Sequence, residues 1–371
     1  MKLEVIRVMD DEGQVVHPER DPALSGDELR RLFRVITLVR ILDERMLRLQ
    51  RQGRMGFYLS SLGEEATHIG AAHALRLSDW LFPAYREAGA ALYRGYPLPT
   101  FMCQLFGNAD DPVKGRQMPV HHSVRRINFV SVSSPVGSHI PHAVGAAWAA
   151  KISKKDDVAV AFFGEGATST PTFHVSANFA AVSKAPAILF CRNNGWAISV
   201  PRSTQTASTT FAGSASAYGL PGVLVDGNDI LAVIHVVREA AARARRGEGA
   251  TLIEALTYRR GAHSTSDNPD AYRDPTEVEE WRRRDPLDRL RKYMQARGEL
   301  PAGLEDQYRG EVNEEIKAAL AFAESRAPKP PLHSLFEDVY ADLPPRLREQ
   351  QAALDAEIEK HGPKVPAHGA D

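Results

Sequence analysis

The feature that most constrains the fold is an alternation of apolar runs with helical segments between residues 131 and 260. The run Asp157–Phe163 is almost continuously apolar, as a strand buried on both faces of a parallel sheet requires. Further runs of this kind are Ala185–Cys191, Gly222–Val225 and Ala250–Tyr258. The helical segments between them are Thr172–Ser183 and Ile230–Arg246. This order predicts an α/β fold, a doubly wound parallel sheet flanked by helices.

The sequence before and after these runs predicts helical additions to the sheet. Val5–Met9 and Gln14–Val16 flank a polar turn and predict a hairpin. Ser25 and Glu28 have the spacing of a capping box, ahead of a helix that we expect to end near Gly53. The division that follows is an N-terminal arm and helix over 1–54, an α/β domain over 55–275, a C-terminal helical extension over 276–360 and a disordered tail over 361–371.

Composition and charge exclude several classes of protein. The chain of 371 residues has 46 Lys and Arg against 47 Asp and Glu, so no global basic field favours nucleic acid or an anionic membrane. Only Cys103 and Cys191 occur, which excludes a disulfide-rich scaffold and is typical of a reducing compartment. The first residues lack the apolar core of a signal peptide, and no apolar run approaches the roughly 20 residues of a membrane span. We therefore expect a cytoplasmic protein that binds neither nucleic acid nor membrane.

Two short motifs follow neighbouring apolar runs and point to one site. Gly164-Glu165-Gly166-Ala167 ends one predicted strand, and Asn193-Asn194-Gly195 ends the next. Ligands of open α/β sheets bind at the carboxyl ends of the strands, so Glu165 and Asn194 should lie close together. Carboxylate and amide oxygens suit Mg²⁺, which completes its shell with phosphate and water oxygens. Each motif alone is more typical of a turn, whereas their spacing across one strand–helix–strand unit indicates a metal that bridges a diphosphate.

The same residues resemble a known motif and a known family. Gly164-Glu165-Gly166 through Asn193-Asn194 resembles the thiamine-diphosphate motif, with Glu165 in place of the more common Asp. The wider sequence, over roughly residues 25–345, resembles the alpha subunit of branched-chain 2-oxo acid dehydrogenase. The segments that carry this resemblance are Gly115–His121, Cys191–Ser199, Val225–Asp229 and His263–Asp267.

The resemblance implies a thiamine-diphosphate-binding fold and assigns roles to individual residues. Glu165, Asn194 and the main-chain carbonyl of Trp196, where relatives usually have Tyr, would ligate Mg²⁺. His263 would be a catalytic acid or base, or a phosphate partner. The residues that would surround the thiamine diphosphate are Tyr85, Arg86, Arg192 and His263 at its phosphates, Gly166 and Ala167 through their backbone N–H groups, and Ser134 and Val136 at its ring and middle portion.

A candidate potassium site and one departure from the family pattern lie beside these residues. By resemblance the potassium ligands would come from Ser133, Pro135, Ser138 and His139, the last of which stands where relatives can have Gln. Relatives carry Glu-Gly-Asp where this chain has Thr170-Pro171-Thr172, with Pro171 placed for the first turn of a helix. The doublet His121-His122 lacks partners at zinc-ligand spacing and is predicted to be part of a loop.

The activity that the resemblance implies is the oxidative decarboxylation of branched-chain 2-oxo acids. The acyl group would then pass to the lipoyl group of a partner acyltransferase. Thiamine enzymes also need a glutamate from a second domain, which the resemblance places on a separate beta subunit, in a complex of two alpha and two beta chains. The alternatives are the alpha subunit of a pyruvate or acetoin dehydrogenase, and a catalytically silent subunit that only binds partners. A nicotinamide-binding protein is disfavoured because no Gly-x-Gly-x-x-Gly opens a helix after a strand.

Overall fold

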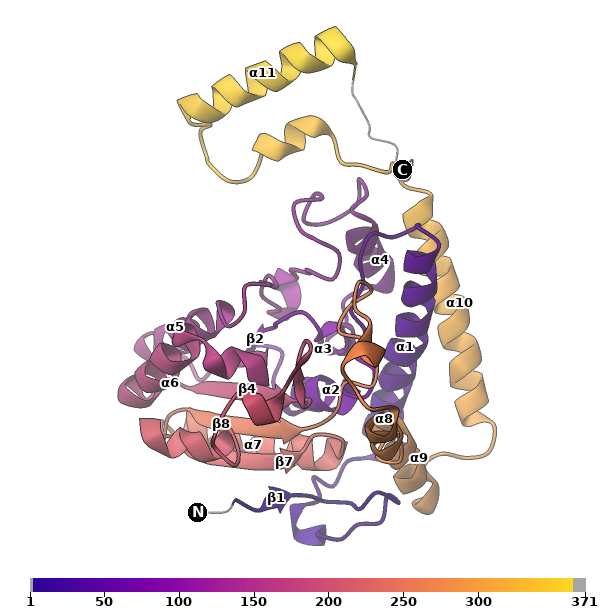
Figure 1. The fold of residues 1–371 in the computed structure, drawn as a ribbon, viewed down its shortest axis with the longest axis vertical. Helices are drawn as coiled ribbons and strands as arrows, with labels where there is room; N and C mark the ends of the chain where they lie inside the picture. The colour runs from indigo at the N-terminus through magenta and orange to yellow at the C-terminus, as the bar shows by residue number, and fades with distance from the viewer. Residues whose placement is uncertain (1–2, 363–371) are drawn as a thin grey trace.

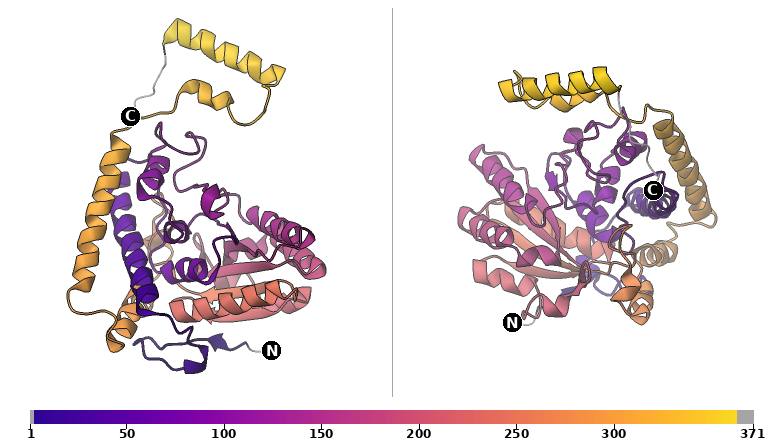
Figure 2. Two further views of the ribbon diagram at one scale, coloured as in Figure 1. Left: turned by 180° about the vertical axis from the view of Figure 1, so that it is seen from behind. Right: turned by 45° about the horizontal axis from the view of Figure 1, so that its top comes forward.

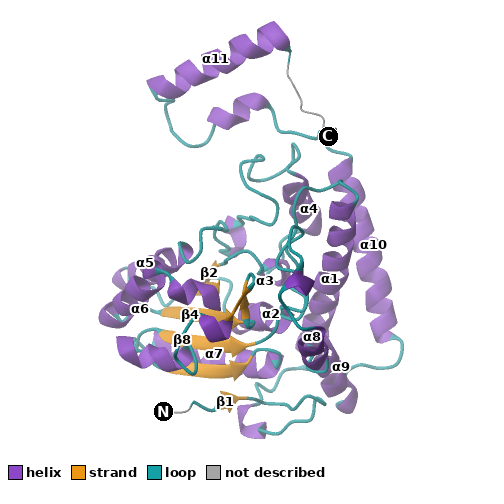
Figure 3. Cartoon of the chain, in the orientation of Figure 1, coloured by secondary structure: helices purple, strands orange, loops and turns teal. Residues whose placement is uncertain are grey.

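The computed structural model describes residues 3–362, and its centre is a six-stranded parallel sheet (Figures 1 and 3). The strand order is β1-β7-β8-β4-β3-β2, which confirms the predicted doubly wound parallel sheet. The strands are β1 (Val5–Ile6), β2 (Trp80–Phe82), β3 (Ala159–Gly164), β4 (Ala187–Asn193), β7 (Gly222–Asp226) and β8 (Thr251–Leu256). A separate two-stranded ribbon is formed by β5 (Trp196–Ala197) and β6 (Val200–Pro201).

The two faces of the sheet are buried under different helices because successive side chains of each strand point in opposite directions. On β3, Val160 and Phe162 join one hydrophobic core, and Ala161 and Phe163 join the other. Helices α2 (Glu65–Ala74) and α7 (Ile230–Arg245) contribute to the first core. Helices α5 (His139–Ile152) and α6 (Pro171–Ser183) contribute to the second. This double burial explains why the central strands read as continuous apolar runs.

The edges of the sheet differ from the prediction. Val5 and Ile6 pair in parallel with Leu224 and Val225 of β7, an edge pairing that was not predicted. The predicted hairpin forms next to its turn, where Met9 and Val15 make an antiparallel bridge and the backbone N–H of Val16 donates to the carbonyl of Val8 at 2.8 Å. The other edge strand, β2, was not predicted, because three residues are too few to show an alternating pattern.

The predicted N-terminal helix forms as α1 (Gly26–Arg51), with a complete capping box between Ser25 and Glu28. Its apolar side chains belong to the same core as the sheet, and α10 (Leu304–Glu324) runs beside it (Figures 1 and 2). The N-terminal helix and part of the C-terminal extension therefore pack onto the α/β body, and the domain boundaries within 1–360 stay a prediction.

The remaining helices lie between the strands or after the sheet. They are α3 (Ala88–Tyr93), α4 (Leu98–Phe106), α8 (Pro275–Arg282), α9 (Pro286–Ala296) and α11 (Pro345–His361). Helix α11 has no buried residue and lies apart from the body of the molecule (Figure 2). Of the tail predicted to be disordered, His361 ends α11 and residues 363–371 lie outside the described part. Within residues 3–362 no helix is both long and apolar enough to cross a membrane.

Candidate functional site

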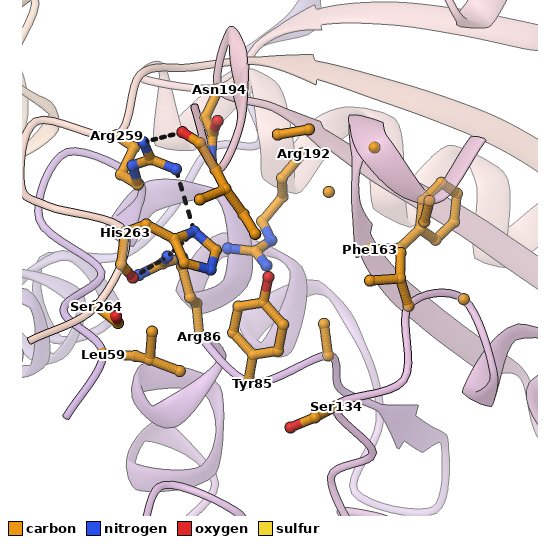
Figure 4. A pocket seen from close by; sticks show the side chains of 18 of the residues that line it. Leu59, Tyr85, Arg86, Ser134, Phe163, Arg192, Asn194, Arg259, His263 and Ser264 are labelled. Atoms are coloured by element: carbon orange, nitrogen blue, oxygen red, sulfur yellow. Dashed lines mark hydrogen bonds between the residues drawn. The ribbon is translucent and has the colours of Figure 1, made fainter. Parts of the chain in front are cut away.

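A cavity of about 420 Å³ opens at the carboxyl ends of β3, β4 and β8 (Figure 4). Most of the residues predicted for the site line it. These are Tyr85, Arg86, Ser133, Ser134, Val136, His139, Glu165, Gly166, Ala167, Arg192, Asn194, Trp196 and His263. Pro135 and Ser138 are not among the lining residues. The structure therefore brings together segments from 85 to 263 that the sequence left far apart.

Glu165 and Asn194 meet at this edge of the sheet, as predicted. Gly164 of β3 is in register with Arg192 of β4, and the backbone N–H of Asn194 donates to Oε2 of Glu165 at 3.4 Å. Burial raises the pKa of Glu165 to about 7, since its carboxyl is removed from water. Among the described residues its Oε1 has no hydrogen-bond partner. A buried carboxylate oxygen without a donor is a suitable ligand for a cation.

The surroundings of Glu165 fit a divalent cation and a diphosphate. The Oδ1 of Asn194 accepts from the backbone N–H of Trp196 at 3.1 Å and keeps a second lone pair. A Cβ at Gly166 would lie 2.8 Å from the Cβ of Ala197, so only glycine fits there. Within residues 3–362 no group of three or more His, Cys, Asp or Glu side chains could hold a metal. The donor set is one carboxylate with amide and carbonyl oxygens, which suits Mg²⁺ bound together with phosphate oxygens.

His263 is held between two arginines at one side of the cavity (Figure 4). Its Nδ1 lies 3.1 Å from Nη2 of Arg86 and 3.2 Å from Nη1 of Arg259. Guanidinium groups can only donate, so Nδ1 accepts and the ring proton of the neutral imidazole is on Nε2. Burial and the charges of Arg86 and Arg259 lower the pKa of His263 to about 3. At neutral pH the ring is therefore an uncharged hydrogen-bond donor.

The cationic side chains of the site are balanced by buried carboxylates. Arg192 is paired through Nη1 with Glu64 at 2.9 Å and through Nη2 with Glu87 at 2.6 Å. Arg86 donates from Nη1 to the carbonyl of Ser60 at 2.6 Å, and burial lowers its pKa. These contacts fix the guanidinium groups in the cavity wall, so little side-chain entropy remains to be lost when an anion binds.

The loop before α5, together with His139 at the start of α5, holds the residues of the candidate potassium site. Oγ of Ser133 lies 2.8 Å from Oγ of Ser138, and Ser134 contacts Nε2 of His121. Nε2 of His139 donates to the carbonyl of Phe162 at 2.6 Å, so its remaining lone pair is on Nδ1. Burial lowers the pKa of His139 to about 4, and the ring is neutral. The potassium assignment to Ser133, Pro135, Ser138 and His139 stays a prediction.

The segment that departs from the family pattern packs against this loop. Thr170 caps α6 through its side chain, and Pro171 occupies the first turn as expected. A Cβ at Gly137 would lie 2.7 Å from Oγ1 of Thr170 and 2.8 Å from Oγ1 of Thr172. The two hydroxyl groups therefore fill the space against Gly137, whose φ of +78° also favours glycine.

An apolar wall of the same cavity was not predicted from the sequence. It is formed by Phe57, Leu59, Met118, Val136 and Ile198. Phe57 and Leu59 come from the segment between α1 and α2, Met118 and Val136 from the long irregular stretch after α4, and Ile198 from the turn between β5 and β6. Residues from three separate segments carry no common sequence spacing, so no pattern could identify them.

Arg259 was also missed, although a signal for it exists. It is 1% exposed and lies three positions after Leu256, the last residue of β8. Its Nη2 donates to the carbonyl of Ile198 at 2.7 Å and to the hydroxyl of Tyr272 at 2.8 Å. The rule that selected Glu165 and Asn194 applies equally to the end of β8, because β8 is the neighbour of β4.

Comparison with known proteins identifies the class. The profile of the family described as "Dehydrogenase E1 component" matches residues 33–332, and the chain belongs to this family. Membership implies that thiamine diphosphate is the cofactor of the site. A beta subunit and a lipoyl-bearing acyltransferase are the partners that this class implies.

Within this family, the chain is similar over its whole length to 2-oxoisovalerate dehydrogenase alpha subunits. The chain is 43% identical to the mitochondrial 2-oxoisovalerate dehydrogenase subunit alpha of Macaca fascicularis, over 100% of this chain and 83% of the relative. The protein of the same name from Homo sapiens is 44% identical over 98% of this chain and 82% of its own length. The Caenorhabditis elegans protein is 44% identical over 98% of this chain and 84% of its own length.

Proposed function

We propose that this chain is the alpha subunit of a thiamine-diphosphate-dependent branched-chain 2-oxo acid dehydrogenase. The observation that carries the proposal is a single cavity that is lined both by Arg86, Arg259 and His263 and by the apolar wall. Cationic and donor groups suit a diphosphate and a carboxylate, and the apolar wall suits an aliphatic side chain. The whole-chain similarity to proteins named 2-oxoisovalerate dehydrogenase subunit alpha supports the same substrate class.

In this proposal Mg²⁺ is held by Glu165, Asn194 and the main-chain carbonyl of Trp196. Thiamine diphosphate, when bound, supplies the carbanion chemistry that decarboxylation of a 2-oxo acid requires. The residues proposed to contact it are Tyr85, Arg86, Arg192 and His263 at the phosphates, Gly166 and Ala167 through their backbone, and Ser134 and Val136 elsewhere along it. A potassium ion at Ser133, Pro135, Ser138 and His139 would brace the loop that carries Ser134 and Val136.

The chain's own residues bind and orient in this reaction. Because both arginines donate to Nδ1 of His263, its Nε2–H is free to donate to a phosphate or acyl oxygen in the cavity. Arg86 and Arg259 keep this tautomer fixed by their position. The apolar wall contributed by Phe57 and Leu59 excludes water from the side chain of the substrate.

The proposed assembly contains two alpha and two beta chains, and it passes the acyl group to the lipoyl group of an acyltransferase. The term "subunit alpha" in the names of the relatives supports a partner chain. A cytoplasmic location belongs to the same proposal, whereas the names of the relatives place those proteins in mitochondria.

Reconstitution with a beta chain tests the proposal. The chain alone should release negligible CO₂ from 3-methyl-2-oxobutanoate, and addition of the beta chain should restore turnover. Pyruvate, offered at the same concentration, should be turned over with a lower kcat/KM. Full activity of the isolated chain would contradict the shared active site, and a preference for pyruvate or an acetoin-derived substrate would assign the chain to those dehydrogenases.

Calorimetry separates an active from a silent subunit. Titration of the alpha–beta complex with thiamine diphosphate and Mg²⁺ should show binding. His263→Ala should keep most of this binding, while kcat/KM in a separate turnover assay falls by roughly 10²-fold or more because the Nε2–H donor is lost. Absence of binding by the wild-type complex would favour a silent subunit that only binds partners.

A further inference from the structure

A fully buried carboxylate, Glu64, lies beside the site without belonging to the predicted ligands. It occupies the N-cap position of α2 and is 0% exposed. Its side chain does not cap the helix and reaches the end of β4 instead. A buried carboxylate is costly to desolvate, so the contacts that it makes there need an explanation.

Glu64 binds two neighbouring residues of the site through its two oxygens. Oε2 accepts from Nη1 of Arg192 at 2.9 Å, and Oε1 accepts from Nδ2 of Asn194 at 3.1 Å. Residues two apart at the end of an extended strand project to the same side, so one carboxylate can hold both. Nε of Arg86 also lies 3.9 Å from Oε1.

The bond to Asn194 determines which end of the amide faces the cavity. A carboxylate only accepts, whereas the amide has a donor end and an acceptor end. Glu64 therefore selects Nδ2, and the Oδ1 of Asn194 must point the other way, where it accepts from the backbone N–H of Trp196 at 3.1 Å. Rotation of the amide by 180° would present a donor to any cation beside Glu165 and would remove a ligand.

We propose that Glu64 is a positioning residue that fixes the amide of Asn194 with its oxygen toward the metal. This inference rests on the proposed function, in which Asn194 ligates Mg²⁺. Groups that orient metal ligands typically change metal affinity by about 10–100-fold when they are mutated. Asn194 is a neutral ligand, and the two ends of its amide differ only in whether they donate or accept a hydrogen bond. Glu64 is the group that orients this amide.

Glu87 provides a matched comparison in the same cluster. Its Oε1 lies 2.6 Å from Nη2 of Arg192, and it too is fully buried. No hydrogen bond between Glu87 and Asn194 occurs within residues 3–362. Glu87→Gln and Glu64→Gln therefore both weaken a buried ion pair with Arg192, but only Glu64→Gln disturbs the amide.

The substitution Glu64→Gln should turn the amide of Asn194. If the new side chain keeps its oxygen on Arg192, its NH₂ group faces Nδ2 of Asn194, and two donors then oppose each other. The exchange Glu64→Gln with Asn194→Asp repairs this contact. The introduced glutamine then accepts from Arg192 and donates to the introduced aspartate, the formal charge of the pair is unchanged, and an oxygen faces the metal in either orientation.

Binding of Mn²⁺ in place of Mg²⁺ measures the effect without turnover. The alpha–beta complex with saturating thiamine diphosphate is titrated with Mn²⁺, and free Mn²⁺ is followed by its electron paramagnetic resonance signal. We expect Glu64→Gln to raise the Kd for Mn²⁺ by about 10–100-fold. Glu87→Gln should cause no comparable loss, and the double variant Glu64→Gln, Asn194→Asp should recover most of the affinity lost in Glu64→Gln.

The outcomes separate this inference from the proposed function. A wild-type complex that binds neither thiamine diphosphate nor Mn²⁺ would refute the proposed function itself. Wild-type binding together with an unchanged Kd in Glu64→Gln, or an equal loss in Glu87→Gln, would overturn the role of Glu64 alone. If Glu64→Gln unfolds before it can be titrated, the double variant is compared with the wild-type complex instead. A Kd for Mn²⁺ in the folded double variant that stays well above the wild-type value also overturns the role of Glu64.

Discussion

His122 is a buried histidine that should make the folded chain sensitive to mild acid. It is 1% exposed and stacks on Phe101 with ring centroids 4.2 Å apart. Within the described residues neither ring nitrogen has a hydrogen-bond partner. Burial, with a smaller contribution from His121, lowers the pKa of His122 to about 3.

The size of the effect follows from the shifted pKa. A histidine whose pKa is lower in the folded than in the unfolded state stabilises the fold above its unfolded pKa, and this contribution is lost as the pH falls toward the folded pKa. In the unfolded chain His122 should titrate near its usual value of 6.5. Between pH 7 and pH 5 the unfolded state gains the proton alone, which removes about 2 kcal/mol of unfolding free energy at about 1.4 kcal/mol per pH unit.

The substitution His122→Phe removes the titrating group and keeps a ring that can stack on Phe101. Urea unfolding of wild type and variant at pH 7, 6 and 5, followed by circular dichroism, gives the unfolding free energies. We expect the stability of the variant relative to wild type to rise by about 2 kcal/mol as the pH falls from 7 to 5. At pH 7 the variant also no longer buries two polar ring atoms without partners.

Tyr96→Phe is the control for this experiment. Tyr96 lies beside His122, with ring centroids 5.4 Å apart, and its buried hydroxyl also has no partner within residues 3–362. Burial raises the pKa of Tyr96 further above neutral, so its loss should change stability equally at pH 7 and pH 5. A difference between wild type and His122→Phe that is the same at both pH values would refute the reasoning.

Further substitutions test the site and its supports. Arg86→Lys keeps the positive charge but loses the planar, two-pronged guanidinium group. Thiamine diphosphate should therefore bind the alpha–beta complex about 10–100-fold more weakly in calorimetric titration, a loss of roughly 1.5–3 kcal/mol. Unchanged affinity would exclude a contact between Arg86 and a phosphate. Glu65→Gln removes the negative charge of a buried ion pair, in which Oε1 of Glu65 lies 2.6 Å from Nε of Arg40. Urea unfolding should show that the unfolding free energy falls by about 3 kcal/mol. A decrease of less than about 1 kcal/mol would argue against a stabilising role of this ion pair. Ser25→Ala removes the capping box with Glu28 and should lower the unfolding free energy, measured in urea, by about 1 kcal/mol. The affinity for the cofactor should not change. An altered affinity would show that the cap also influences the site.

The central sheet and the metal pair could be predicted because their determinants are local. The strands β3 and β4 are continuous apolar runs, and the residues that follow each strand must lie at the same edge of a parallel sheet. Glu165 and Asn194 were found in this way. The cap at Ser25 could be predicted for the same reason, because a capping box lies within four consecutive residues.

The edge strands and the apolar wall could not be predicted. Strand β1 has two residues, and its parallel partner β7 lies more than two hundred positions along the chain. Phe57, Met118 and Ile198 share a cavity only because separate loops converge on it. Short or dispersed elements have no periodicity, so their partners depend on packing of the whole chain.

By itself, the sequence determined the class of fold, the thiamine-diphosphate motif and the edge of the sheet that carries it. Only the tertiary structure decided that Glu64 accepts from Nδ2 of Asn194, that Arg86 and Arg259 both face Nδ1 of His263, and that Arg192 lies between two buried carboxylates. Sequence patterns record which residues are buried and which turns or caps are favoured. The direction of a hydrogen bond between residues more than one hundred positions apart is set by how helices and strand ends pack around a shared, desolvated cavity.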